Sequence, residues 1–170
     1  GIDGAPMGRI LAKAKELGAT TTCDFLMSPR DDAQDVIMPS LPHIDYLMPN
    51  IEEAGWLVGT RDRAAIVRWL HDAGVGCTLL TMGAEGVSVA VRGTQEEVIA
   101  PYKVDVVDST GCGDAFTSGF ISGLIGGLGL ERAVDRGLAC GSLVATGLGS
   151  DAGIVDLAQV EAFQKTAERP

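Results

Sequence analysis

The amino-acid sequence predicts an α/β domain in which helices wrap a mostly parallel sheet. Helical and strand-like segments alternate along the 170 residues, and residues 77–82 form an apolar run typical of a parallel strand buried on both faces. In sheets of this class, ligands bind beyond the carboxyl ends of the strands. We therefore expect functional residues in the loops that follow the strands.

Periodicity and turn residues predict the individual elements. The expected helices are at 7–17, 61–73, 114–125, 131–146 and 157–167. The expected strands are at 19–25, 44–48, 77–82, 86–91 and 97–100, the last two paired across Gly93-Thr94. In the first helix, Ile10, Leu11, Ala14 and Leu17 share one side. Thr60 is the expected N-cap of the second, and a glycine-rich break follows the third.

Composition excludes several classes of function. Nearly half of the residues are apolar and the formal net charge is −10, so a nucleic-acid or anionic-membrane surface is not expected. A small polyanion such as ATP would need a local site of backbone amides, a cation or a metal. The four cysteines are far apart and form no C-x-x-C pair. We expect reduced thiols in a cytoplasmic protein rather than a zinc site or a disulfide framework.

The segment 108–116, with the sequence DSTGCGDAF, carries the strongest functional signal. Gly111 and Gly113 leave backbone amides unshielded at the start of a helix, where free N–H groups and the helix dipole favour a phosphate. The carboxylate of Asp114 would repel a phosphate but could accept a proton from an attacking hydroxyl. We therefore predict a phosphoryl-transfer loop with Asp114 as the catalytic base.

Alternatives to this interpretation can be compared with the sequence. A P-loop requires a lysine, which is missing here, and a dinucleotide fingerprint requires Gly or Ala where Phe116 stands. Absence of NAD binding would eliminate a dinucleotide-dependent oxidoreductase. An ordinary turn with Asp108 or Ser109 as a helix cap is the structural alternative.

Two further motifs follow predicted strands. In 49–53 (PNIEE), Asn50 and Glu53 have the spacing of a helix capping box. In 81–86 (TMGAEG), the glycines suit a tight turn that requires positive φ.

Together the three motifs resemble the pfkB, or ribokinase-like, carbohydrate kinases. Residues 108–116 resemble the second signature of that family, D-[ST]-T-G-A-G-D-x-F, with Cys112 in place of the usual small residue. Asn50 and Glu53 match its N-x-x-E element, and Thr81, Gly83 and Gly86 match T-x-G-x-x-G. We interpret Cys112 first as a small buried residue, and second as a thiol whose pKa the helix N-terminus lowers.

The resemblance implies a ribokinase-like three-layer αβα fold and an ATP-dependent kinase. Asp114 would be the base, and the amides of Gly111, Cys112 and Gly113 would stabilise the transition state. Asn50 and Glu53 would organise Mg²⁺ through water, while Thr81, Gly83, Gly86 and Gly113 would contact the nucleotide. Asp108 and Thr110 match positions that hold a monovalent cation such as K⁺ in many relatives. The acceptor would be a hydroxymethyl group of a sugar or nucleoside.

The resemblance covers only the later part of the family pattern, without the early Gly-Gly signature, most sugar-binding residues and the lid. We therefore expect residues 1–170 to be a single nucleotide-binding α/β domain, the C-terminal portion of a longer kinase. Alone it would be weakly active or inactive, because a closed lid also excludes water. A non-catalytic nucleotide-binding or interaction module is the alternative, and a homodimer stays open as an assembly.

Overall fold

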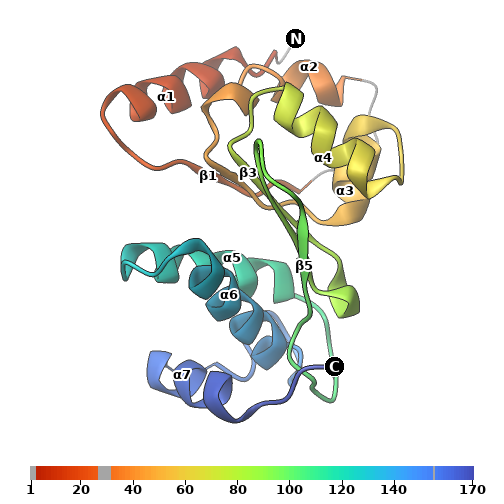
Figure 1. Ribbon diagram of the computed structural model, residues 1–170, viewed down its shortest axis with the longest axis vertical. Coiled ribbons are helices and arrows are strands. Elements are labelled where there is room, and N and C mark those ends of the chain that lie inside the picture. The colour runs from red at the N-terminus through yellow and green to blue at the C-terminus, as the bar shows by residue number, and fades with distance from the viewer. Residues whose placement is uncertain (1–2, 27–31, 155) are drawn as a thin grey trace. The chain divides into compact units, whose positions relative to one another are not determined.

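The chain folds into two compact units. The computed structural model describes residues 3–26, 32–154 and 156–170 (Figure 1). The first unit comprises Gly1–Met82 and Ser88–Ile99, and the second comprises Gly83–Val87 and Ala100–Pro170. The expectation of a single nucleotide-binding domain over residues 1–170 stays a prediction.

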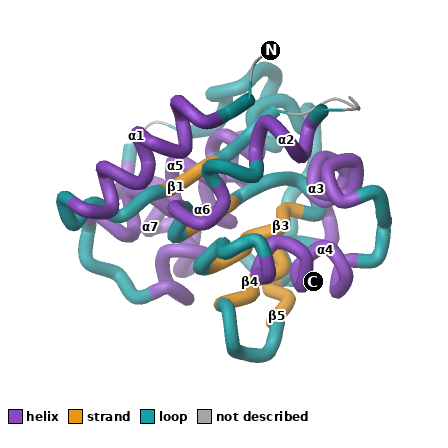
Figure 2. Tube along the Cα trace, turned by 90° about the horizontal axis from the view of Figure 1, so that it is seen from above, coloured by secondary structure: helices purple, strands orange, loops and turns teal. Residues whose placement is uncertain are grey.

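One sheet contains all five named strands, in the order β1-β2-β3-β4-β5. They are β1 (Thr22–Cys23), β2 (Tyr46–Leu47), β3 (Cys77–Thr81), β4 (Val87–Val91) and β5 (Glu97–Ile99). The pairs β1–β2 and β2–β3 are parallel, with Thr22 opposite Tyr46 and Tyr46 opposite Cys77. β4 and β5 follow short connections, which suit antiparallel neighbours (Figure 2). The predicted α/β class with a mostly parallel sheet is confirmed.

Among the described residues of the first unit, four α-helices are found. They are α1 (Ala5–Glu16), α2 (Ala33–Ile37), α3 (Ile51–Val58) and α4 (Arg63–Asp72), and a 3₁₀ turn, η1, spans Leu41–His43. The buried core of this unit consists of Ala33, Leu41, Ile44, Leu47, Ala54, Leu57, Ile66, Val67, Leu70, Val75, Leu80 and Ala90. Apolar residues from α3, α4 and the strands therefore share one core.

One expectation for these helices, the N-cap of α4, is corrected. The N-cap of α4 is Asp62, whose carboxylate accepts a hydrogen bond from the Ala64 N–H; Thr60 instead accepts one from the Asp62 N–H. On α1, the apolar side is only partly covered, because Ile10 is 63% and Leu17 75% exposed.

The second unit contains α5 (Cys112–Ile125), α6 (Leu130–Val144) and α7 (Leu157–Thr166). Glycines allow α5 and α6 to approach closely. A Cβ at Gly119 would lie 2.7 Å from the Cys140 sulfur, and a Cβ at Gly137 would lie 2.8 Å from the Phe116 carbonyl oxygen. Glycines on both helices therefore serve the close packing of α5 against α6.

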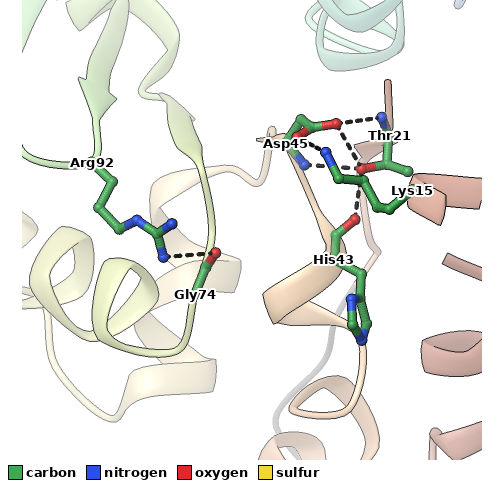
Figure 3. Close-up of polar contacts among 6 residues, drawn as sticks. All are labelled: Lys15, Thr21, His43, Asp45, Gly74 and Arg92. Carbon is green, nitrogen blue, oxygen red and sulfur yellow. Dashed lines mark hydrogen bonds and ion pairs between the residues drawn. The ribbon is translucent and has the colours of Figure 1, made fainter. Parts of the chain in front are cut away.

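A polar cluster ties α1 to the amino ends of β1 and β2 (Figure 3). The Asp45 carboxylate forms an ion pair with Lys15 and accepts hydrogen bonds from the N–H (2.9 Å) and hydroxyl (3.2 Å) of Thr21. The Thr21 hydroxyl also contacts the His43 carbonyl oxygen at 2.6 Å. On the other side of the picture, Arg92 donates to the Gly74 carbonyl oxygen at 3.2 Å. These contacts lie at the strand ends opposite to those expected to bind ligands.

The four cysteines are free thiols. Burial raises the pKa of Cys23 to about 11 and that of Cys77 to about 12, so both stay protonated at neutral pH. Within the described part of the chain, no helix combines the length and apolar character needed to cross a membrane.

Candidate functional site

The predicted capping box at Asn50 is confirmed. Asn50 is the N-cap of α3, its side-chain oxygen accepts from the Glu53 N–H at 2.8 Å, and its own N–H donates to the Glu53 carboxylate at 3.2 Å. Glu53 is only 6% exposed, whereas Asn50 is exposed. The reciprocal hydrogen bonds fix the Glu53 carboxylate at the helix N-terminus.

The structure places Thr81 beside this capping box. Asn50 and Thr81 form an isolated parallel bridge, and the Thr81 N–H donates to the Pro49 carbonyl oxygen at 3.1 Å. The chain segments after β2 and β3 therefore lie side by side. Two of the sequence motifs thus meet at the carboxyl ends of neighbouring parallel strands, where α/β sheets bind ligands.

The turn after Thr81 has the predicted conformation. Gly83 and Gly86 have φ values of 57° and 89°, and the Gly86 N–H donates to the Gly83 carbonyl oxygen at 3.0 Å. Residues Gly83–Glu85 form a 3₁₀ turn, η2. Gly83 is exposed, and a Cβ there would meet nothing within 4 Å. The turn therefore presents its backbone to solvent.

In the second unit, Asp108 organises the loop before α5. Its carboxylate accepts from the N–H (3.0 Å) and the hydroxyl (2.8 Å) of Thr110, and from the Gly149 N–H at 3.1 Å. The hydrogen bonds from Thr110 and then Gly149 lower the pKa of Asp108 from its ordinary value of 3.8. Asp108 thus joins both ends of the α5–α6 hairpin as a carboxylate at neutral pH.

The alternative with Asp108 or Ser109 as a helix cap is wrong. The N-cap of α5 is Gly111, which has a φ of 79° and caps the helix without a side chain. The helix begins at Cys112, two residues before the expected start. A Cβ on Gly111 would lie 2.5 Å from both the Cα and the carbonyl oxygen of Ser150. Backbone conformation and space therefore both require glycine here.

Neither backbone conformation nor a close neighbour requires glycine at position 113. Its φ lies outside the positive region, and a Cβ would meet nothing within 4 Å. Its N–H is in the first turn of α5, where a helix provides no acceptor, and among the described residues no backbone carbonyl oxygen accepts from it. Gly113 is exposed and has open space where a side chain would be, as expected of an anion site at a helix N-terminus.

Cys112 and Asp114 flank this glycine. The Cys112 N–H donates to the Ser109 carbonyl oxygen at 3.2 Å, so this amide already has a partner. Burial, and then the charge of Asp108, raise the pKa of the Cys112 thiol, which favours the small, half-buried residue over the activated thiol. Asp114 is exposed in the first turn of α5, so a substrate can reach its carboxylate.

The functional residues form two groups. Asn50, Glu53 and Thr81 belong to the first unit, and residues 108–114 to the second. Convergence of the groups on one ligand stays a prediction. Ser150, which lies against Gly111, was not singled out from the sequence. Among the described residues, no three His, Cys, Asp or Glu side chains gather in a group that could hold a metal ion.

Comparison with known proteins decides the family. The model of the pfkB family carbohydrate kinases matches residues 4–156, which include all three motifs. The chain belongs to this family. The resemblance inferred from the motifs is thereby confirmed.

Individual relatives of this pfkB-family chain are kinases of different acceptors. It is 32% identical over 125 residues to the cytidine kinase of Thermococcus kodakarensis, covering 71% of this chain and 45% of that protein. Arabidopsis thaliana ribokinase, complexed with ribose and ATP, superimposes with a TM-score of 0.83 at 24% identity, covering 93% of this chain and 51% of the other.

A third relative is a fructokinase double mutant from Vibrio cholerae with bound fructose, ADP and potassium ion. It has a TM-score of 0.82 at 23% identity and covers 93% of this chain and 54% of the other. The two structures establish a ribokinase-like fold. The chain spans about half the length of the relatives it matches.

Proposed function

We propose that the protein transfers the γ-phosphoryl group of ATP to a hydroxymethyl group of a sugar or nucleoside. The observation that carries this proposal is the start of α5. There the exposed Gly113, whose N–H has no acceptor within the helix, is followed directly by the exposed Asp114. A phosphoryl-transfer site needs donors for the phosphoryl oxygens and a base or positioning group for the acceptor hydroxyl, and this segment offers both. Membership of the pfkB family supports this reaction class.

The residues of the loop 108–116 have separate roles in the proposed reaction. Asp114 accepts the proton of the attacking hydroxyl, and the amides of Gly111 and Gly113 bind the phosphoryl oxygens. The Cys112 amide joins them if its 3.2 Å bond to Ser109 gives way to the stronger bond to a charged oxygen. Thr81, Gly83 and Gly86 contact the nucleotide from the second motif.

The capping box fits a water-mediated Mg²⁺ site. Mg²⁺ keeps several waters and uses few protein carboxylates, and one oxygen of Glu53 is already occupied by the Asn50 N–H. Asn50 and Glu53 would therefore hold the water shell of the ion rather than the ion itself. When bound, the ion neutralises negative charge on the nucleotide phosphates.

Asp108 and Thr110 are the proposed contacts of a monovalent cation. Because the Asp108 carboxylate is occupied by Thr110 and Gly149, backbone carbonyl oxygens of this loop suit K⁺ better than the carboxylate does. The potassium ion bound to the fructokinase of Vibrio cholerae supports this proposal. A cytoplasmic location and a homodimer remain predictions.

Titration with Mg-ATP, with and without sugars and nucleosides, tests the proposed function. The protein is expected to bind Mg-ATP and to form a phosphate ester with at least one acceptor, while residues 1–170 alone are weakly active or inactive. Binding of Mg-ATP without ester formation by the full-length protein, across ribose, fructose, 2-keto-3-deoxygluconate, adenosine and pyrimidine nucleosides, would instead support the non-catalytic nucleotide-binding module.

A further inference from the structure

An ion pair in the first unit lies next to the Thr81 motif without belonging to it. Arg63 is the first residue of α4, and its Nε lies 2.6 Å from Oε1 of Glu96, just before β5. The side chains are 40% and 22% exposed. The pair is therefore partly shielded from solvent, which makes its attraction stronger than that of a fully exposed pair.

Each partner also contacts a residue that flanks the segment 83–87. The Arg63 Nη1 atom lies 4.0 Å from the sulfur of Met82, and the Glu96 carboxylate accepts a hydrogen bond from the Ser88 hydroxyl. Ser88 is fully buried. Met82 and Ser88 are the first-unit residues immediately before and after the segment 83–87, so one ion pair contacts both residues that flank it.

This arrangement bears on the position of Thr81. Thr81 is the last residue of β3, directly before Met82, and it bridges to Asn50. The turn that follows has positive φ at Gly83 and Gly86, and glycine offers little resistance to a change of backbone conformation. The residues that flank the turn therefore help to fix where the end of β3 lies.

We propose that Arg63 and Glu96 are positioning residues for nucleotide binding, because they hold the end of β3 and its Thr81 in the geometry that binds ATP. They act through Met82 and Ser88 and need not contact the nucleotide. This inference rests on the proposed function, in which Thr81 contacts ATP. It adds two residues that none of the three motifs contains.

A purely structural role is the competing explanation, and the same unit offers a matched control. Lys15 and Asp45 form another ion pair between a helix and the strand region, with side chains 40% and 29% exposed (Figure 3). That pair lies at the amino ends of β1 and β2, away from Thr81. Loss of Lys15 should therefore affect stability but not the nucleotide.

The test compares Arg63→Met with Lys15→Met by titration with Mg-ATP and by separate KM values for ATP and acceptor. Arg63→Met is expected to raise the Kd and KM for ATP by about 3- to 30-fold, with the acceptor KM unchanged. Arg63→Lys should recover most of the ATP affinity. Glu96→Gln, which keeps an acceptor for Ser88, should weaken ATP binding less than Arg63→Met.

The outcomes separate this inference from the proposed function. Unchanged ATP affinity in Arg63→Met would overturn the positioning role, and so would an equal loss of ATP affinity in Lys15→Met. Neither result would contradict the proposed kinase function. If Arg63→Met does not fold, Glu96→Gln with wild-type ATP affinity has the same consequence. A wild-type protein that does not bind Mg-ATP would refute the proposed function, and the positioning role with it.

Discussion

Gly111 and Gly113 differ in backbone conformation and in the space around them. Gly111 needs positive φ and has Ser150 against it, whereas Gly113 has ordinary φ and open space where a Cβ would be. The first glycine is required by the fold. For the second, we propose that the glycine leaves room for a ligand to approach its amide.

Alanine substitutions at the two positions should therefore have different effects. Gly111→Ala is expected to lower the free energy of unfolding by about 2 kcal/mol or more, through strain and the clash with Ser150. Gly113→Ala should change it by less than about 1 kcal/mol, yet lower kcat/KM by at least about tenfold because the methyl group displaces the phosphate.

Urea denaturation and steady-state kinetics measure the two effects. A Gly113→Ala variant with normal kinetics would show that this amide is not part of the anion site. A Gly111→Ala variant of wild-type stability would contradict the close approach of Ser150.

Local spacing made some of these residues predictable. Asn50 and Glu53 are three residues apart, so the sequence alone predicts their reciprocal hydrogen bonds. The bond from Gly149 to Asp108 joins residues 41 positions apart. Such a contact depends on how α5 and α6 pack against each other and bring residue 149 back to residue 108. The periodicity of a single sequence contains no information about this packing.

At the scale of elements, Asp45 connects α1 to the amino ends of the strands. Burial of its carboxylate alone would raise the pKa, but the hydrogen bonds from Lys15 and Thr21 outweigh it and lower the pKa below its ordinary value of 3.8. A carboxyl whose pKa is lowered by folding stabilises the protein above its unfolded pKa. The stabilisation is lost as the pH falls through the folded pKa.

Asp45→Asn should lower the free energy of unfolding by about 1–2 kcal/mol at pH 7. The difference from wild type should shrink as the pH falls below about 4 and through the lowered pKa of Asp45. Urea denaturation between about pH 2.5 and pH 7, on both sides of the ordinary carboxyl pKa, measures this difference. A difference that is independent of pH would mean that the ionised carboxylate does not provide the stabilisation.

Hydrophobic periodicity predicts that a helix exists better than it predicts the residue at which the helix begins. α4 begins at Arg63 because Asp62 caps it, although Thr60 was the expected cap. α5 begins at Cys112 because the left-handed Gly111 ends the preceding loop. The five-residue α2 was not predicted, since it is too short for a helical period to emerge.

At the scale of the whole molecule, alternation of elements predicted the α/β class, and the parallel ladders β1–β2 and β2–β3 confirm it. The strand order β1-β2-β3-β4-β5 was not predicted. Order depends on long-range packing of strands that are only two to five residues long. The three motifs indicated the family because each lies within a segment of nine residues or fewer and can be recognised without knowledge of long-range contacts.

The central claim is that Asp114 is the base of a phosphoryl-transfer reaction. Its most direct test is the turnover of Asp114→Asn in the full-length enzyme, with Glu131→Gln as the control. Glu131 is likewise an exposed acidic residue in the first turn of a helix, α6, so both changes remove a similar favourable interaction with a helix dipole. Asp114→Asn is expected to lower kcat by about 10²- to 10⁴-fold while Mg-ATP binding remains, and Glu131→Gln to leave kcat unchanged. Near-normal turnover of Asp114→Asn would contradict the claim.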